Sequence, residues 1–143
     1  LEFRRVLFRS AAAAGRATPA QISDIEDAFC RCAASRNMEA YEVADESFHR
    51  ALAAATGSIL LRSLFETVNE ARKEIAWGAM RTSILKPERR DAFTAEHERV
   101  VQAIRNRDAN GAWAAMNAHV ETIAEIYEAI DKAQTIGHRL IAI

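Results

Sequence analysis

The sequence predicts an all-α protein, an antiparallel helical bundle with short connections. Apolar residues recur at intervals of three and four along most of the chain, and no segment shows the strict alternation typical of β-strands. The chain has only 5 glycines and 2 prolines, and no low-complexity linker or internal repeat divides it. Its 143 residues are enough for one domain with a core of its own.

The first ten residues, LEFRRVLFRS, are left out of this fold prediction. Arginines interrupt each apolar run, a pattern that does not predict a secretory signal in this segment. Its end, LFRS, can be encoded as CTC TTC CGA TCT, which looks like the end of a common sequencing adapter. We therefore expect residues 1–10 to be a sequence artefact, with a single domain over residues 11–143 and the natural N-terminus missing.

Local signals place the first two helices. Thr18 and Pro19 form a typical helix start, because threonine caps the free N–H groups and proline is favoured at the first helical position. The polar residues at 35–37 end this helix, and a second follows over about residues 38–55. Gly57 is expected to end that second helix in the left-handed conformation.

Three further helices complete the predicted bundle. The third covers about residues 58–82, with one apolar side made of Leu61, Leu64, Phe65, Val68, Ile75 and Ala79. The fourth begins at Pro87 and reaches about residue 106, and the fifth runs from Asp108 to about Asp131, followed by a short tail. We expect Trp77 and Trp113 to fill the core rather than to line a pocket.

Composition excludes two classes of partner for this chain. The formal net charge is -1 and the charged segments mix both signs, which argues against a nucleic-acid-binding surface. Uncharged runs such as residues 51–61 are far shorter than the roughly 20 residues that a membrane span needs. Cys30 and Cys32 point to different sides of a helix, as expected for two reduced thiols. These features predict a cytoplasmic protein.

Two histidines are expected to face each other inside the bundle. His97 lies on an apolar stripe with Phe93 and Val100, and His119 lies on one with Met116 and Val120. The fourth and fifth helices turn near residues 107–108, about ten and eleven positions from the two histidines. At ~1.5 Å per residue both reach nearly the same height in an antiparallel hairpin.

Asp45 and His49 bring the number of converging donors to four. They are neighbours at i and i+4 on the second helix, beside the stripe of Tyr41, Phe48 and Leu52. A buried carboxylate needs a cation or several donors nearby. Imidazoles and one carboxylate suit a divalent transition metal such as zinc, nickel, iron or manganese. The alternative is a set of core histidines satisfied by hydrogen bonds.

Two longer stretches, DESFHRALAAATGS and EHERVVQAIRNRDANGAWAAMNAHV, resemble a known family. Their pattern of D-x-x-F-H, L-x-x-A-T-G, E-H, A-I-x-x-x-D and M-x-x-H is similar to the FCD domain, the C-terminal effector-binding domain of FadR-subfamily GntR transcription regulators. The resemblance covers about residues 11–131. Where the family often has asparagine after T-G, this chain has Ser58.

The resemblance implies a function and a site. In metal-binding members the matching positions, Asp45, His49, His97 and His119, bind the metal, and the effectors are small carboxylates such as sugar acids, hydroxy acids or dicarboxylates. It also implies a homodimer. The first helix of the domain is expected to be partly missing, and the winged helix-turn-helix domain to be absent, so the chain would reach operator DNA only through that missing domain.

An effector acid that binds the metal could be held at a second point by a buried cation, and Arg72 is the candidate. It falls within the apolar side of the third helix, and a guanidinium can hold a carboxylate through two hydrogen bonds. The alternative is an arginine that pairs with a glutamate on the helix surface.

An enzyme is the competing class of function. Glu46 and His49 form a Glu-x-x-His unit of the kind used in di-iron bundles, but the positions three before His97 and His119 hold Thr94 and Met116. A mononuclear metalloenzyme would need a general base, and Glu96, next to His97, is expected to point about 100° away from the metal. A bundle with a purely structural metal is a third reading. The prediction is a sensor, not an enzyme.

Overall fold

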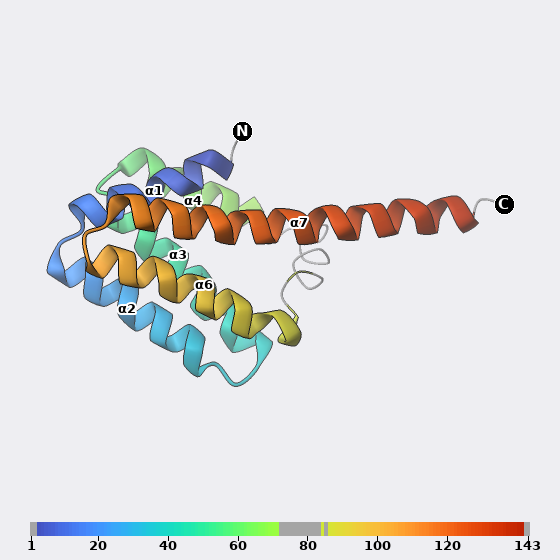
Figure 1. Cartoon of the computed structure of the whole chain (residues 1–143), viewed down its shortest axis with the longest axis horizontal. Coiled ribbons are helices and arrows are strands. Elements are labelled where there is room, and N and C mark those ends of the chain that lie inside the picture. The colour runs from blue at the N-terminus through green and yellow to red at the C-terminus, as the bar shows by residue number, and fades with distance from the viewer. Residues whose placement is uncertain (1–2, 72–83, 85, 142–143) are drawn as a thin grey trace.

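The computed structural model describes residues 3–71, 84 and 86–141, and every regular element within these ranges is an α-helix (Figure 1). The predicted all-α bundle is therefore confirmed. The helices are α1 (Phe3–Arg16), α2 (Pro19–Ala34), α3 (Met38–Ala55), α4 (Ile59–Ala71), α6 (Pro87–Arg105) and α7 (Ala109–Ile141). No helix in these ranges is long and apolar enough to cross a membrane.

The local signals set the helix boundaries as predicted. Thr18 caps α2: its side chain accepts a hydrogen bond from the N–H of Gln21, whose own side chain accepts one from the N–H of Thr18. Asn37 caps α3 through its side-chain oxygen, which accepts a hydrogen bond from the N–H of Ala40. Gly57 follows α3 with a φ of 68°, the left-handed value that glycine adopts without strain.

Three pairs of helices make the most extensive contacts, and the core is built around them: α2 packs against α3, and α7 packs against both α6 and α1. Its largest fully buried side chains include Tyr41, Phe48, Phe93, Ile25, Ile104, Met116 and His97. In the part of α1 whose side chains are described, residues 10–16, the buried side chains are the small Ser10, Ala13 and Ala14, which lets this part of the helix lie close along α7 (Figure 1). The described part of residues 1–10 thus belongs to α1, and the origin of that segment stays a prediction.

The fifth predicted helix is longer than expected. It was placed to end near Asp131, but α7 continues to Ile141 and extends beyond the other helices (Figure 1). The sequence after Asp131 contains no proline, and lysine, alanine, glutamine, arginine and leucine all favour a helix. Nothing local therefore stops the helix at the predicted position.

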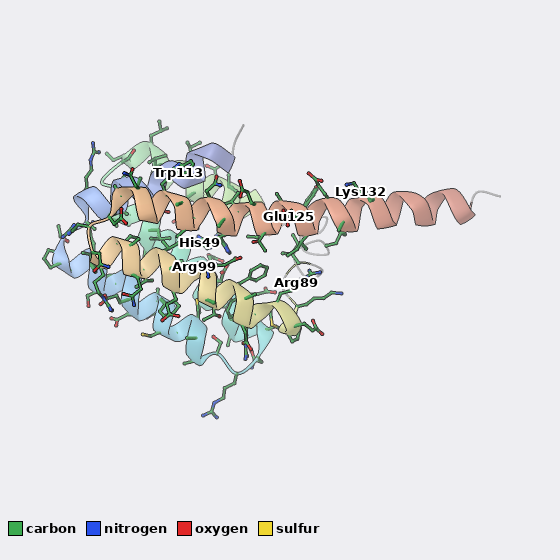
Figure 2. All side chains as sticks on the ribbon, viewed as in Figure 1. His49, Arg89, Arg99, Trp113, Glu125 and Lys132 are labelled. Atoms are coloured by element: carbon green, nitrogen blue, oxygen red, sulfur yellow. The ribbon has the colours of Figure 1, made fainter. Side chains whose placement is uncertain are left out.

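Two apolar side chains expected inside the core are exposed. Val68 is 47% exposed, and among the described helices α4 packs mainly against α3. Trp113 on α7 is 46% exposed (Figure 2), because it follows the fully buried Ala112 and is rotated about 100° from it around the helix. Trp77 and the remainder of the predicted third helix lie outside the described residues.

Candidate metal centre

Helix α3 carries Asp45 and His49 one turn apart on the side that faces the bundle. Tyr41, Phe48 and Leu52 are buried on the same helix and hold this side against the core. The side chains of Asp45 and His49 are 15% and 14% exposed, and an oxygen of Asp45 lies 3.8 Å from Nε2 of His49. The two polar groups therefore sit at the edge of the apolar core rather than on the outer surface.

The α6–α7 hairpin brings His97 and His119 to the same height, as predicted from their distances to the turn. His97 is completely buried and His119 is 2% exposed. Their Nε2 atoms lie 3.3 Å apart. The turn is held by Asp108, whose side chain accepts a hydrogen bond from the N–H of Gly111 at the start of α7.

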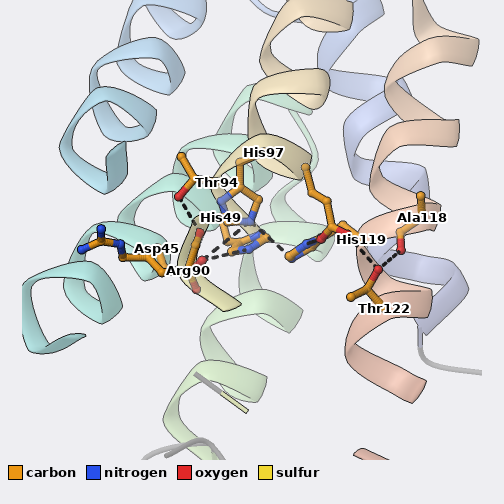
Figure 3. Close-up of polar contacts among 9 residues, drawn as sticks. Asp45, His49, Arg90, Thr94, His97, Ala118, His119 and Thr122 are labelled. Carbon is orange, nitrogen blue, oxygen red and sulfur yellow. Dashed lines mark hydrogen bonds and ion pairs between the residues drawn. The ribbon is translucent and has the colours of Figure 1, made fainter. Parts of the chain in front are cut away.

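The four predicted residues meet at one point between α3, α6 and α7 (Figure 3). One ring nitrogen from each of His49, His97 and His119 lies within 4.8 Å of the other two. Asp45 joins this group through an oxygen 3.7 Å from Nε2 of His97 and 3.8 Å from Nε2 of His49. The remaining predicted site residue, Arg72, lies outside the described residues.

The separations suit a transition-metal ion. Metal–ligand bonds of ~2.0–2.2 Å place neighbouring ligand atoms about 3–3.5 Å apart. The 3.3 Å between His97 and His119 falls within this range, and the two Asp45 distances exceed it by a few tenths of an ångström. Three imidazoles and one carboxylate would leave one or two positions of an octahedral ion open.

Burial keeps the central imidazole in the form that a metal needs. Loss of hydration, with a smaller effect from His119, lowers the pKa of His97 well below its usual value. A neutral imidazole retains a lone pair for coordination. The rings of Phe48 and Phe93 pack against His97 and His119, with centroids 4.6 and 5.7 Å away, and they limit the movement of both histidines.

Comparison with known families shows which family the chain belongs to. The family model for the FCD domain matches residues 1–122 of the chain. The chain belongs to the FCD domain family. No curated protein matches it. The matched residues include the four at the centre of Figure 3, so the resemblance noted in the two sequence stretches is confirmed at the level of the family.

Glu96 of this FCD domain is a residue whose place the sequence did not predict. It is only 8% exposed, and one of its oxygens lies 2.7 Å from Nδ1 of His119, while the other accepts a hydrogen bond from the hydroxyl of Thr122 at 2.8 Å. Rotation by about 100° from His97 does turn Glu96 away from the convergence point, but toward α7 instead of solvent. Thr122 could have indicated this position in the sequence, because it lies three residues after His119, on the same side of the helix, and can donate a hydrogen bond to a carboxylate.

Opposing effects act on the Glu96 carboxyl group. Burial alone would raise its pKa, but the hydrogen bonds from His119 and Thr122 outweigh burial and lower the pKa below its usual value. Glu96 is therefore a carboxylate at neutral pH, and a carboxylate only accepts hydrogen bonds.

The FCD domain also has an open hollow of about 470 Å³ beside α1. Its walls are α1 and the α3–α4 connection, including Arg16, Thr56 and Ser58. None of the four convergent residues lines it.

Proposed function

We propose that this FCD domain is a metal-dependent effector sensor of a GntR-type transcription regulator of the FadR subfamily. Asp45, His49, His97 and His119 would hold a divalent transition metal, and a small organic acid would complete its coordination. The acid would alter DNA binding by an N-terminal domain outside this chain. In this proposal the regulator is a cytoplasmic homodimer.

The observation that carries the proposal is the convergence of one carboxylate and three imidazoles from three helices on one point. A metal bound there would supply a Lewis acid with an open position for an acid's carboxylate. The residues themselves hold the geometry: α3 presents two of the donors together, and the α6–α7 hairpin presents the other two. A ligand that favours one packing of these helices can shift the equilibrium between two states of the regulator.

The alternative of a mononuclear metalloenzyme has less support. Such an enzyme needs a base close to a metal-bound water. The buried carboxylate nearest in sequence, Glu96, is already engaged by His119 and Thr122. Because the family is that of a regulatory domain, we infer that the chain is not an enzyme.

Arg72 remains the proposed second anchor for the effector. A guanidinium that faced the metal could bind the far carboxylate of a dicarboxylate through two hydrogen bonds. Loss of acid binding with unchanged metal content in Arg72→Ala would support this role. Unchanged acid affinity in that variant would remove it.

Elemental analysis combined with a thermal-shift screen tests the proposal. We expect one metal ion per chain, and a rise in melting temperature with at least one of glycolate, malonate, citrate or gluconate. His97→Ala should abolish both effects, whereas Asp91→Asn, which changes a carboxylate on the exposed side of α6, should retain both. Wild-type protein without metal and without any acid-dependent shift would overturn the proposal.

Chelation separates a sensor from a bundle with a purely structural metal. If the metal serves sensing, the chelated protein stays folded but no longer responds to the acid. If the metal is only structural, chelation unfolds the protein and the acids have no effect in either form.

A further inference from the structure

A buried carboxylate contacts one of the convergent histidines through the ring nitrogen that points away from the convergence point. Glu96 on α6 contacts Nδ1 of His119 on α7, at 2.7 Å. The same carboxylate is held by Thr122, whose hydroxyl oxygen lies 2.8 Å from Glu96 and 3.1 Å from the backbone carbonyl of Ala118. Three side chains therefore form a chain of contacts that leads away from the convergence point (Figure 3).

This contact determines which ring nitrogen of His119 carries the proton. A neutral imidazole has one N–H and one lone pair. Because the carboxylate of Glu96 can only accept, the proton resides on Nδ1, and the lone pair resides on Nε2. It is Nε2 that lies 3.3 Å from Nε2 of His97, on the side where the four donors meet.

A hydrogen bond from the second ring nitrogen also restricts rotation of the imidazole. Without Glu96, His119 could turn about its side-chain torsions or take the other tautomer, and either change would remove the lone pair from the convergence point. Outer partners of this kind commonly change metal affinity by ~10–100-fold.

We propose that Glu96 is the positioning residue of the metal centre: it fixes the tautomer and ring orientation of His119, and Thr122 in turn fixes Glu96. The expected effect on metal affinity rests on the proposed function. The orientation of His119 is a property of the chain without metal.

The test compares Glu96→Ala with Glu96→Gln. Alanine removes the acceptor, whereas glutamine keeps a carbonyl oxygen that can accept from Nδ1–H without the negative charge. Glu98→Gln is the matched control, because Glu98 is an exposed glutamate two positions further along α6. Long-range ¹H–¹⁵N correlation spectra of the metal-free protein report the His119 tautomer, and competition with a chromophoric chelator gives the zinc affinity.

We expect a single Nδ1–H tautomer of His119 in the wild type, in Glu98→Gln and, for the most part, in Glu96→Gln. Glu96→Ala should give a mixture of tautomers and a loss of zinc affinity of ~10–100-fold, with a smaller loss in Glu96→Gln. An unchanged tautomer and unchanged zinc affinity in Glu96→Ala would overturn the inference. A purely structural role for Glu96 would change the melting temperature and leave the tautomer as it is, which also overturns it.

A second pair of variants covers the case in which Glu96→Ala does not fold. Thr122→Val removes the hydroxyl that holds Glu96, and Thr122→Ser keeps it. We expect weaker zinc binding in the valine variant and recovery in the serine variant; equal affinities would contradict the chain of contacts. Failure of the wild type to bind zinc, nickel, iron or manganese would overturn the proposed function, and the tautomer of the metal-free protein would still decide whether Glu96 orients His119.

Discussion

Nε2 of His97 and Nε2 of His119 lie 3.3 Å apart, although 22 positions separate the two residues in the sequence. The short turn between α6 and α7 produces this contact, since each histidine lies about three helical turns from it. Arg107 in the turn has a φ of 57° and donates a hydrogen bond to the backbone carbonyls of Ala14 and Ala17 at the end of α1. The hairpin that carries two of the four convergent residues is therefore tied to the rest of the bundle.

Replacing Asp45 by asparagine should weaken metal binding more than any change at Glu96. The substitution keeps the size of the side chain but removes the only predicted anionic donor. Residues that hydrogen-bond a metal ligand commonly change metal affinity by ~10–100-fold, so loss of a direct metal ligand should lower the affinity by more than ~100-fold. Zinc affinity measured by chelator competition checks this. Asp91→Asn is the control, and equal affinities in the two variants would exclude Asp45 as a donor.

Removing the metal should lower the melting temperature without unfolding the protein at room temperature. A ligand present at one hundred times its dissociation constant stabilises the folded state by ~2.7 kcal/mol. For a chain of this size we expect chelation to lower the melting temperature by about 5–10 °C. Differential scanning calorimetry with and without chelator measures the change. His97→Ala should show no difference, and a similar drop in that variant would place the metal elsewhere.

Two glycines should respond to alanine in opposite directions. Gly57 has a φ of 68°, so a Cβ atom there is strained although the space around it is open, and the expected loss of stability is ~1–2 kcal/mol. Gly15 lies in the last turn of α1 with nothing within 4 Å of an added Cβ, so Gly15→Ala should stabilise by up to ~0.5–1 kcal/mol. Urea denaturation gives both values. Equal effects would contradict the left-handed end of α3.

The two cysteines should differ in their reactivity toward alkylating agents. Burial, with a smaller contribution from the charge of Asp45, raises the pKa of Cys32 to about 12, and this side chain is 1% exposed. Cys30 is exposed. Because the thiolate is the reacting form, Cys32 stays inert at pH 8, and its thiolate fraction rises about tenfold per pH unit until the pH reaches its pKa.

Mass spectrometry after treatment with iodoacetamide at pH 8 measures this difference. Native Cys30→Ser should remain unmodified, whereas native Cys32→Ser should take one label. In denaturant both variants should take one label. Equal rates in the two native variants would contradict the burial of Cys32.

Local interactions explain which boundaries could be predicted. The starts of α2 and α6 at Pro19 and Pro87 and the end of α3 at Gly57 depend on backbone restrictions of single residues, which act in any context. The predicted end of the last helix, near Asp131, was wrong because no such residue marks the end of α7. The common height of His97 and His119 was also predictable, since helical rise and a short turn fix it.

By itself, the sequence determined the helical class, most helix boundaries and the four residues that lie together, Asp45, His49, His97 and His119. These follow from periodicity and from residues close in sequence. Only the tertiary structure decided that Glu96 lies against His119, that Trp113 and Val68 are exposed, and that Asp45 lies 3.7 Å from His97. The physical reason is that a helix fixes the angle between its own side chains, whereas what each side chain meets depends on the helices packed around it.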